Sequence, residues 1–225
     1  MRRLHEKQLS IAEIAPAEAD KLERLRVAVG PQFDLAIDGH QGGVPQPISS
    51  NTAAQICAAV EDAGLLLYEE PLAYENVRGY AWLRRKTRVP IAGGESVSGI
   101  DGFERFLEAD ALESVQPDLG WVGGIGIAQA VLTGAQARGL RGAIHTGGSV
   151  GPGLAASLHL AIAHRAAMVL ERVVASTRVQ DLLFVEPLKV VDGALRAPTA
   201  PGLGVEFRED VIRGHPYQPG SGERT

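Results

Sequence analysis

The sequence predicts an α/β fold that is part of a parallel (β/α) barrel. Short apolar runs alternate along the chain with longer helical stretches. Continuous apolar runs are typical of strands that are buried on both faces, as in a parallel sheet. Their alternation with helices indicates repeated βα units. The predicted strands are residues 33–38, 65–70, 89–95, 112–118, 141–145 and 167–171.

Each predicted strand ends in an ionisable residue. These residues are 23 to 31 positions apart, or one βα unit each: Asp38, Glu69, Glu95, Asp118, His145 and Glu171. In a barrel of the TIM type all strand C-termini lie on one face, where such enzymes carry out their chemistry. We therefore expect the six side chains to converge at one mouth. An open doubly wound sheet is the alternative, but no G-x-G-x-x-G motif follows an early strand.

Helices are predicted between the strands, at 51–64, 75–87, 99–110 and 124–139. Asn51 is a suitable cap for the first helix, and Gly64 and Gly139 suit helix ends. After about residue 180, Val-rich pieces, an Asp-Gly turn and a Pro/Gly-rich loop predict a hairpin or extended segment outside the barrel. We expect two parts: residues 1–185 as a partial barrel that carries a metal site, and 186–225 as a C-terminal extended segment and tail.

The composition is that of a soluble globular protein, with 45% hydrophobic and 22% charged residues in 225. A net charge of −5 argues against nucleic acid, which requires a basic surface. The single cysteine, Cys57, excludes an internal disulfide and fits a reducing compartment. No segment has the length of a membrane span or the apolar core of a signal peptide. A cytoplasmic protein without a membrane partner is therefore expected.

Three carboxylates, Asp38, Glu69 and Glu95, end successive strands. Alone they would repel one another and raise each other's pKa values. A bound divalent cation removes this conflict, and ligation by oxygen alone favours Mg²⁺ first and Mn²⁺ second. The alternative is that such acids cap helices or pair with arginines.

The next strands supply groups for acid–base chemistry. An Asp118 carboxylate on a His145 ring nitrogen would fix the tautomer and raise the basicity of the other nitrogen, as a general base requires. Glu171, if protonated, would donate a hydrogen bond to a developing oxyanion. His40 lies two residues beyond the first strand end and is either a general acid or a plain loop histidine. Glu70 is expected to pair with a basic group deeper in the barrel.

Two further features bear on the chemistry expected at the mouth. The Gly-rich stretch "HTGGSVGPG" at 145–153 either binds an anionic or hydroxylated substrate through backbone amides or forms a tight βα loop. A Schiff-base aldolase is disfavoured because no lysine ends a predicted strand.

Together, "YEEPL", "AGGES", "VQPDLGWVGGI", "IHTGGS", "VLE" and "PGLGVEF" resemble the enolase superfamily. Over residues 20–208 the sequence is most similar to the mandelate racemase subgroup, which includes acid-sugar dehydratases such as galactonate dehydratase. The resemblance implies a His base and Mg²⁺ that stabilise an enediolate. The implied Mg²⁺ ligands are Asp38, Glu69 and Glu95.

The resemblance also implies catalytic roles. His145, oriented by Asp118, would remove the proton α to the substrate carboxylate, and Glu171 would hydrogen-bond that carboxylate. His40, in "DGH" at 38–40, would protonate the departing β-hydroxyl. The implied function is a Mg²⁺-dependent acid-sugar dehydratase, a lyase that forms a 2-keto-3-deoxy acid. A racemase or epimerase is the first alternative, and an inactive truncated fragment or a binding or assembly module is the second.

The resemblance is to part of the family's structure. The six strands correspond to strands three to eight of the eight-stranded barrel, and the N-terminal capping domain has no counterpart. We therefore expect a fragment of a longer protein, or a barrel completed by a homo-oligomer or a partner chain.

Overall fold

The computed structural model describes residues 10–147, 149, 151–174 and 177–216. Six strands form one parallel sheet in chain order, and each pairs with the next. This order follows from βα units in which a helix returns the chain to the start of a neighbouring strand. The strands are β1 (Leu35–Asp38), β2 (Leu65–Glu69), β3 (Ile91–Gly93), β4 (Ser114–Val115), β5 (Arg141–Ile144) and β6 (Ala167–Leu170).

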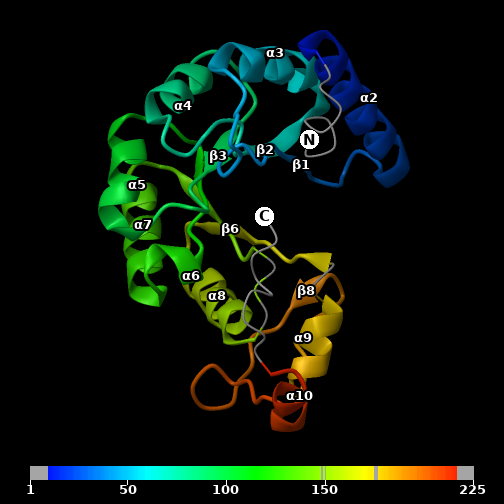
Figure 1. Cartoon of the computed structure of the whole chain (residues 1–225), viewed down its shortest axis with the longest axis vertical. Helices are drawn as coiled ribbons and strands as arrows, with labels where there is room; N and C mark the ends of the chain where they lie inside the picture. The colour runs from blue at the N-terminus through cyan, green and yellow to red at the C-terminus, as the bar shows by residue number, and fades with distance from the viewer. Residues whose placement is uncertain (1–9, 148, 150, 175–176, 217–225) are drawn as a thin grey trace.

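The sheet is curled, and the helices cover its convex side (Figure 1). Within the described residues, β1 and β6 each have one neighbour in the sheet, so the curve is not closed. The predicted truncated barrel is thus confirmed. None of the described helices is long and apolar enough to cross a membrane. The helices of this part are α2 (Ile11–Val29), α3 (Ser50–Val60), the 3₁₀ helix η1 (Glu61–Ala63), α4 (Val77–Arg84), α5 (Gly99–Glu108), α6 (Leu119–Val122), α7 (Ile125–Ala137) and α8 (Pro152–Ala163).

The main core lies between the sheet and its helices. It includes large side chains that are almost fully buried, such as Tyr68 on β2 and Ile91 on β3. The rings of Tyr80 and Phe106 meet edge to face with centroids 5.4 Å apart, which joins α4 to α5. A smaller apolar cluster contains Leu67, Ala92, Ala143 and the partly buried Met168, contributed by β2, β3, β5 and β6.

The local signals at helix ends were partly correct. Gly64 follows η1 in the left-handed conformation with φ 63°, and Gly139 follows α7 with φ 74°. Asn51 was the wrong cap for α3. Ser49 is in extended conformation and its hydroxyl accepts from Thr52 N at 3.1 Å, so the helix begins earlier than predicted.

The single cysteine has a structural position. Cys57 is buried in α3, and burial raises the pKa of its thiol to about 12. Because the thiolate is the reactive form, this thiol is inert at neutral pH.

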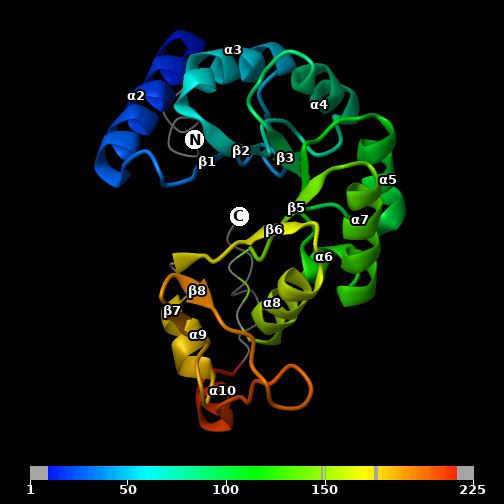
Figure 2. The ribbon, with the colours of Figure 1, turned by 180° about the vertical axis from the view of Figure 1, so that it is seen from behind.

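After β6 the chain forms α9 (Thr177–Leu183), a hairpin of β7 (Val190–Val191) and β8 (Ala194–Leu195), and α10 (Glu209–Gly214). Asp192 and Gly193 form the hairpin turn with φ values of 51° and 77°, as the Asp-Gly pair predicted. Phe184 and Phe207 stack with ring centroids 5.4 Å apart. These elements lie together at the end of the molecule away from α3 (Figure 2).

Candidate active site

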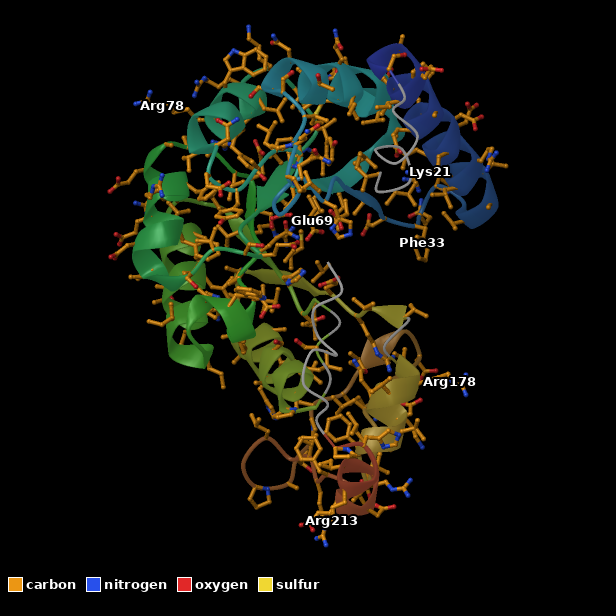
Figure 3. All side chains as sticks on the ribbon, viewed as in Figure 1. Lys21, Phe33, Glu69, Arg78, Arg178 and Arg213 are labelled. Atoms are coloured by element: carbon orange, nitrogen blue, oxygen red, sulfur yellow. The ribbon has the colours of Figure 1, made fainter. Side chains whose placement is uncertain are left out.

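The ionisable residues that end the strands lie along one rim of the curled sheet. Asp38 and Glu69 are the last residues of β1 and β2 and are paired in register. Glu95 follows β3 by two residues, and His145 directly follows β5. Figure 3 shows Glu69 on the inner side of the curve, whereas Arg78 lies on the outer, helical side. The parallel sheet therefore brings together groups that are far apart in sequence.

Asp118 and His145 form the best-defined contact of this rim. Their backbones pair as an isolated parallel bridge, and Nδ1 of His145 lies 2.8 Å from Oδ2 of Asp118. The other oxygen, Oδ1, accepts from Gly120 N at 2.7 Å, which fixes the carboxylate. Burial alone would raise the pKa of Asp118, but the hydrogen bonds that its carboxylate accepts from His145 and Gly120 outweigh burial and lower the pKa. An ionised Asp118 therefore leaves Nε2 of His145 as the nitrogen available for proton transfer.

Nε2 of His145 faces two carboxylates, Glu95 Oε2 at 3.4 Å and Glu171 Oε2 at 3.6 Å. Burial lowers the pKa of His145, but the hydrogen bond to Asp118 and the charges of Glu95 and Glu171 outweigh it and raise the pKa to about 9. At this pKa the imidazole is largely protonated near neutral pH, so it becomes available as a general base there only when the charges of Glu95 and Glu171 are compensated.

Glu171 follows β6 and is held by the loop after β5. Its Oε2 accepts from Thr146 N at 2.9 Å and Gly147 N at 3.3 Å, and Thr146 Oγ1 donates to its backbone carbonyl. These contacts place Glu171 beside His145, and hydrogen-bond donation by Glu171 stays a prediction. Residues 148 and 150 of the Gly-rich stretch lie outside the described residues.

Two acids and the histidine form the tightest cluster. Ligand atoms of Glu69, Glu95 and His145 all lie within 4.8 Å of one another. Burial and the charge of Asp38 raise the pKa of Glu69 to about 8, and burial also raises the pKa of Glu95. Within the described part of the chain, no lysine or arginine forms an ion pair with Asp38 or with any of these residues.

Asp38 lies beside this cluster, and its carboxylate contacts His40. Oδ1 accepts from His40 N at 2.8 Å, and Oδ2 lies 2.9 Å from His40 Nε2. Burial raises the pKa of Asp38 despite these contacts. His40 also lines a cleft of about 310 Å³ together with Glu70 and Glu95. The structure thus places the predicted general acid on the same side as the acids.

This donor set fits a hard divalent cation. Asp38, Glu69 and Glu95 supply oxygen ligands, which Mg²⁺ prefers. Oε2 of Glu95 is buried and has no hydrogen-bond partner among the described residues, although it lies within ion-pair distance of His145. Burial is the main cause of the raised pKa values of Asp38, Glu69 and Glu95, and the charges of neighbouring carboxylates add to it.

Sequence reasoning missed or misplaced two residues. Among the residues that the structure describes, Glu70 forms no ion pair with a basic side chain, and its Oε2 instead accepts from Gly42 N at 3.0 Å. Gln116 is buried, and a hydrogen bond between it and Glu69 lowers the pKa of Glu69 against the larger effect of burial. The sequence pattern could have identified Gln116, because Gln116 lies two residues before Asp118 and residues with this spacing share one face of a strand.

Residues 9–211 match the family described as enolase C-terminal domain-like. The chain belongs to this family. It is 31% identical over 196 residues to the D-galactarolactone cycloisomerase of Agrobacterium fabrum, covering 84% of this chain and 50% of that protein. It is 30% identical over 214 residues to the D-galactonate dehydratase of Xanthomonas campestris pv. campestris, covering 92% and 54%. The chain therefore spans about half the length of the curated relatives that it matches.

Solved structures agree in fold. The 3,6-anhydro-D-galactonate cycloisomerase of Zobellia galactanivorans superposes with a TM-score of 0.80 at 27% identity, covering 92% of this chain and 56% of that one. An enolase from Bradyrhizobium, solved with magnesium and mandelic acid, gives 0.77 at 27% identity, covering 92% and 52%. This family's enzymes thus include a dehydratase and cycloisomerases that act on small molecules.

Proposed function

We propose that the chain is the barrel part of a Mg²⁺-dependent acid-sugar dehydratase. The observation that carries the proposal is the His145–Asp118 contact of 2.8 Å, with Nε2 of the same ring directed toward Glu95 and Glu171. This is the arrangement of an oriented general base beside a carboxylate cluster. The 30% identity to a D-galactonate dehydratase supports the substrate class.

The residues divide the reaction between them. His145 takes the proton α to the substrate carboxylate through Nε2, and Asp118 stabilises the resulting imidazolium. Glu171, fixed by the amides of Thr146 and Gly147, lies beside this nitrogen to bind the substrate carboxylate. Mg²⁺ bound by Asp38, Glu69 and Glu95 would supply the positive charge that stabilises the carboxylate as negative charge develops on it.

His40 carries the second half of the reaction. It approaches the mouth from β1, whereas His145 approaches from β5, so two acid–base groups line different parts of one rim. In elimination, the β-hydroxyl leaves as water with a proton from His40. The enol product then tautomerises to a 2-keto-3-deoxy acid. A racemase or epimerase would share the first step and need no acid at this position.

The test is turnover of D-galactonate and related acid sugars in D₂O with Mg²⁺, followed by NMR. Deuterium at the α-carbon reports proton abstraction, and the 2-keto-3-deoxy acid reports elimination. His145→Asn should abolish both signals. His40→Asn should keep the exchange and slow elimination by roughly 10²- to 10⁴-fold, the usual contribution of a general acid.

The opposite results separate the alternatives. An epimer as the product, formed equally fast by His40→Asn, would identify a racemase or epimerase. A folded chain that binds Mg²⁺ but shows neither signal with any acid sugar would contradict catalysis by this chain.

A further inference from the structure

The loop that carries His40 is attached to the end of β2. Gly39 N donates to the carbonyl of Glu69 at 2.7 Å, and Gln41 N donates to the carbonyl of Glu70 at 3.1 Å. His40 thus lies between two residues whose amides are both bonded to one neighbouring strand end. The position of its ring depends on how firmly this attachment holds.

The Glu70 side chain completes the attachment. It is only 2% exposed, and its Oε2 accepts from Gly42 N at 3.0 Å. Within the described residues no lysine or arginine forms an ion pair with it, and its Oε1 accepts no hydrogen bond. The packing is close as well, because a Cβ added to Gly42 would lie 2.1 Å from Oε1 of Glu70. A buried carboxylate used in this way fixes the loop through both a hydrogen bond and a steric contact.

The backbone at this junction is unusual. His40 and Glu70 have φ values of 49° and 38°, in the left-handed region that residues with a side chain rarely adopt. Such conformations persist only where the surroundings hold them, and they gather at functional sites. Here the contacts between the two segments supply that hold.

We propose that Glu70 is a positioning residue for His40. Its carboxylate fixes Gly42 and with it the loop that places the His40 ring at the mouth. This deepens the proposed function and rests on it, since His40 is the acid that protonates the departing hydroxyl. His145 is held by Asp118 and lies beside Glu171, at the ends of β5, β4 and β6, and these contacts do not involve the His40 loop. Loss of the Glu70 contact should therefore affect elimination and leave proton abstraction in place.

The first experiment compares Glu70→Ala with Glu70→Gln. Alanine removes the acceptor for Gly42 N, whereas glutamine keeps an amide oxygen there. Glu70→Ala should lower the ratio of elimination to α-proton exchange by about tenfold or more, since misplacing a reacting group by about 1 Å has effects of this size or larger. Glu70→Gln should restore most of the ratio. Glu104→Ala, an exposed change on α5, is the control.

A pair of glycine substitutions tests the same contact from the loop. A Cβ at Gly42 meets the Glu70 carboxylate, whereas a Cβ at the neighbouring Gly43 meets nothing within 4 Å. Gly42→Ala should therefore lower the ratio, and Gly43→Ala should keep it. In the Glu70→Ala background, Gly42→Ala should add little, because the group that it meets is gone.

Hydrogen exchange gives a readout that needs no turnover. In Glu70→Ala and Gly42→Ala the amides of Gln41 and Gly42 should exchange roughly tenfold faster, as expected when a hydrogen bond to a charged group is lost. Unchanged exchange in both variants would overturn the proposal, whatever the activity. Equal losses of elimination and α-proton exchange would also overturn it, because Glu70 would then be supporting the whole fold. If the wild type shows no turnover, the proposed function fails and the amide exchange still decides the positioning role.

Discussion

Acidic residues occur in two contrasting settings in this protein. At the strand-end rim, Glu69, Glu95 and Asp38 are partly buried, and His145 is the basic side chain that faces Glu95. At the C-terminal helix α10, Asp210 and Glu209 form exposed ion pairs with nearby arginines. Arg178 on α9 and Arg213 on α10 both lie far from Glu69 in Figure 3.

The contrast separates carboxylates that are placed to bind a ligand from carboxylates that lie in solvent at the protein surface. Exposed ion pairs are screened by water and contribute little to stability. Buried carboxylates without a cation destabilise the fold, which is why their pKa values rise. A fold that retains such a cluster is expected to use it, because functional sites are commonly maintained at the expense of stability.

The largest expected effect comes from the proposed metal site. Glu69→Gln removes one carboxylate from the cluster and should abolish stabilisation by Mg²⁺. In the wild type, Mg²⁺ at 100 times its Kd should stabilise the chain by about 2.7 kcal/mol, seen as a rise in the thermal midpoint. A Glu69→Gln chain with the same Mg²⁺-dependent rise would remove Glu69 from the ligand set.

The next effect concerns the base. Asp118→Asn keeps the shape of the side chain but replaces the charge that holds Nδ1–H of His145. We expect α-proton exchange to fall by about 10²-fold or more, since an oriented base commonly contributes 10²- to 10⁴-fold. A circular dichroism spectrum like that of the wild type is the control. Exchange at the wild-type rate would mean that Asp118 has no orienting role.

A pH dependence of the metal-free chain follows from the rim. Folding raises the pKa of Glu69 from 4.5 to about 8 and that of His145 from 6.5 to about 9. Between pH 4.5 and 9 the folded state therefore binds more protons than the unfolded state, so stability falls as pH rises. Thermal melts in EDTA should show this decline, and it should be smaller in Glu69→Gln. A midpoint that rises across this range would contradict the burial of uncompensated acids.

The smallest effect is expected at the C-terminal helix. Arg213 pairs with Glu209 one helical turn away, and both side chains are about three-quarters exposed. Arg213→Ala should leave the thermal midpoint and the Mg²⁺ response within error of the wild type. A clear loss of stability would show that surface pairs in this segment contribute more than the contrast implies.

The sequence by itself determined the order of strands and the rim. A parallel βα repeat places every strand C-terminus on the same edge, so a residue that ends an apolar run is assigned to the mouth without knowledge of packing. Asp38, Glu69 and His145 lie at strand ends for this reason. The Asp-Gly hairpin turn was equally local, because its φ values depend on those two residues alone.

Only the tertiary structure decided which side chains touch across the rim. The contact of Glu70 with Gly42 joins two loops that are 28 residues apart in sequence. Glu171 accepts amides from the loop after another strand. Such distances depend on loop paths and on steric fit between segments far apart in sequence. Hydrophobic periodicity carries no information on loop paths or on steric fit. These contacts could therefore be assigned only from the folded structure, in which the curled sheet brings the loops together.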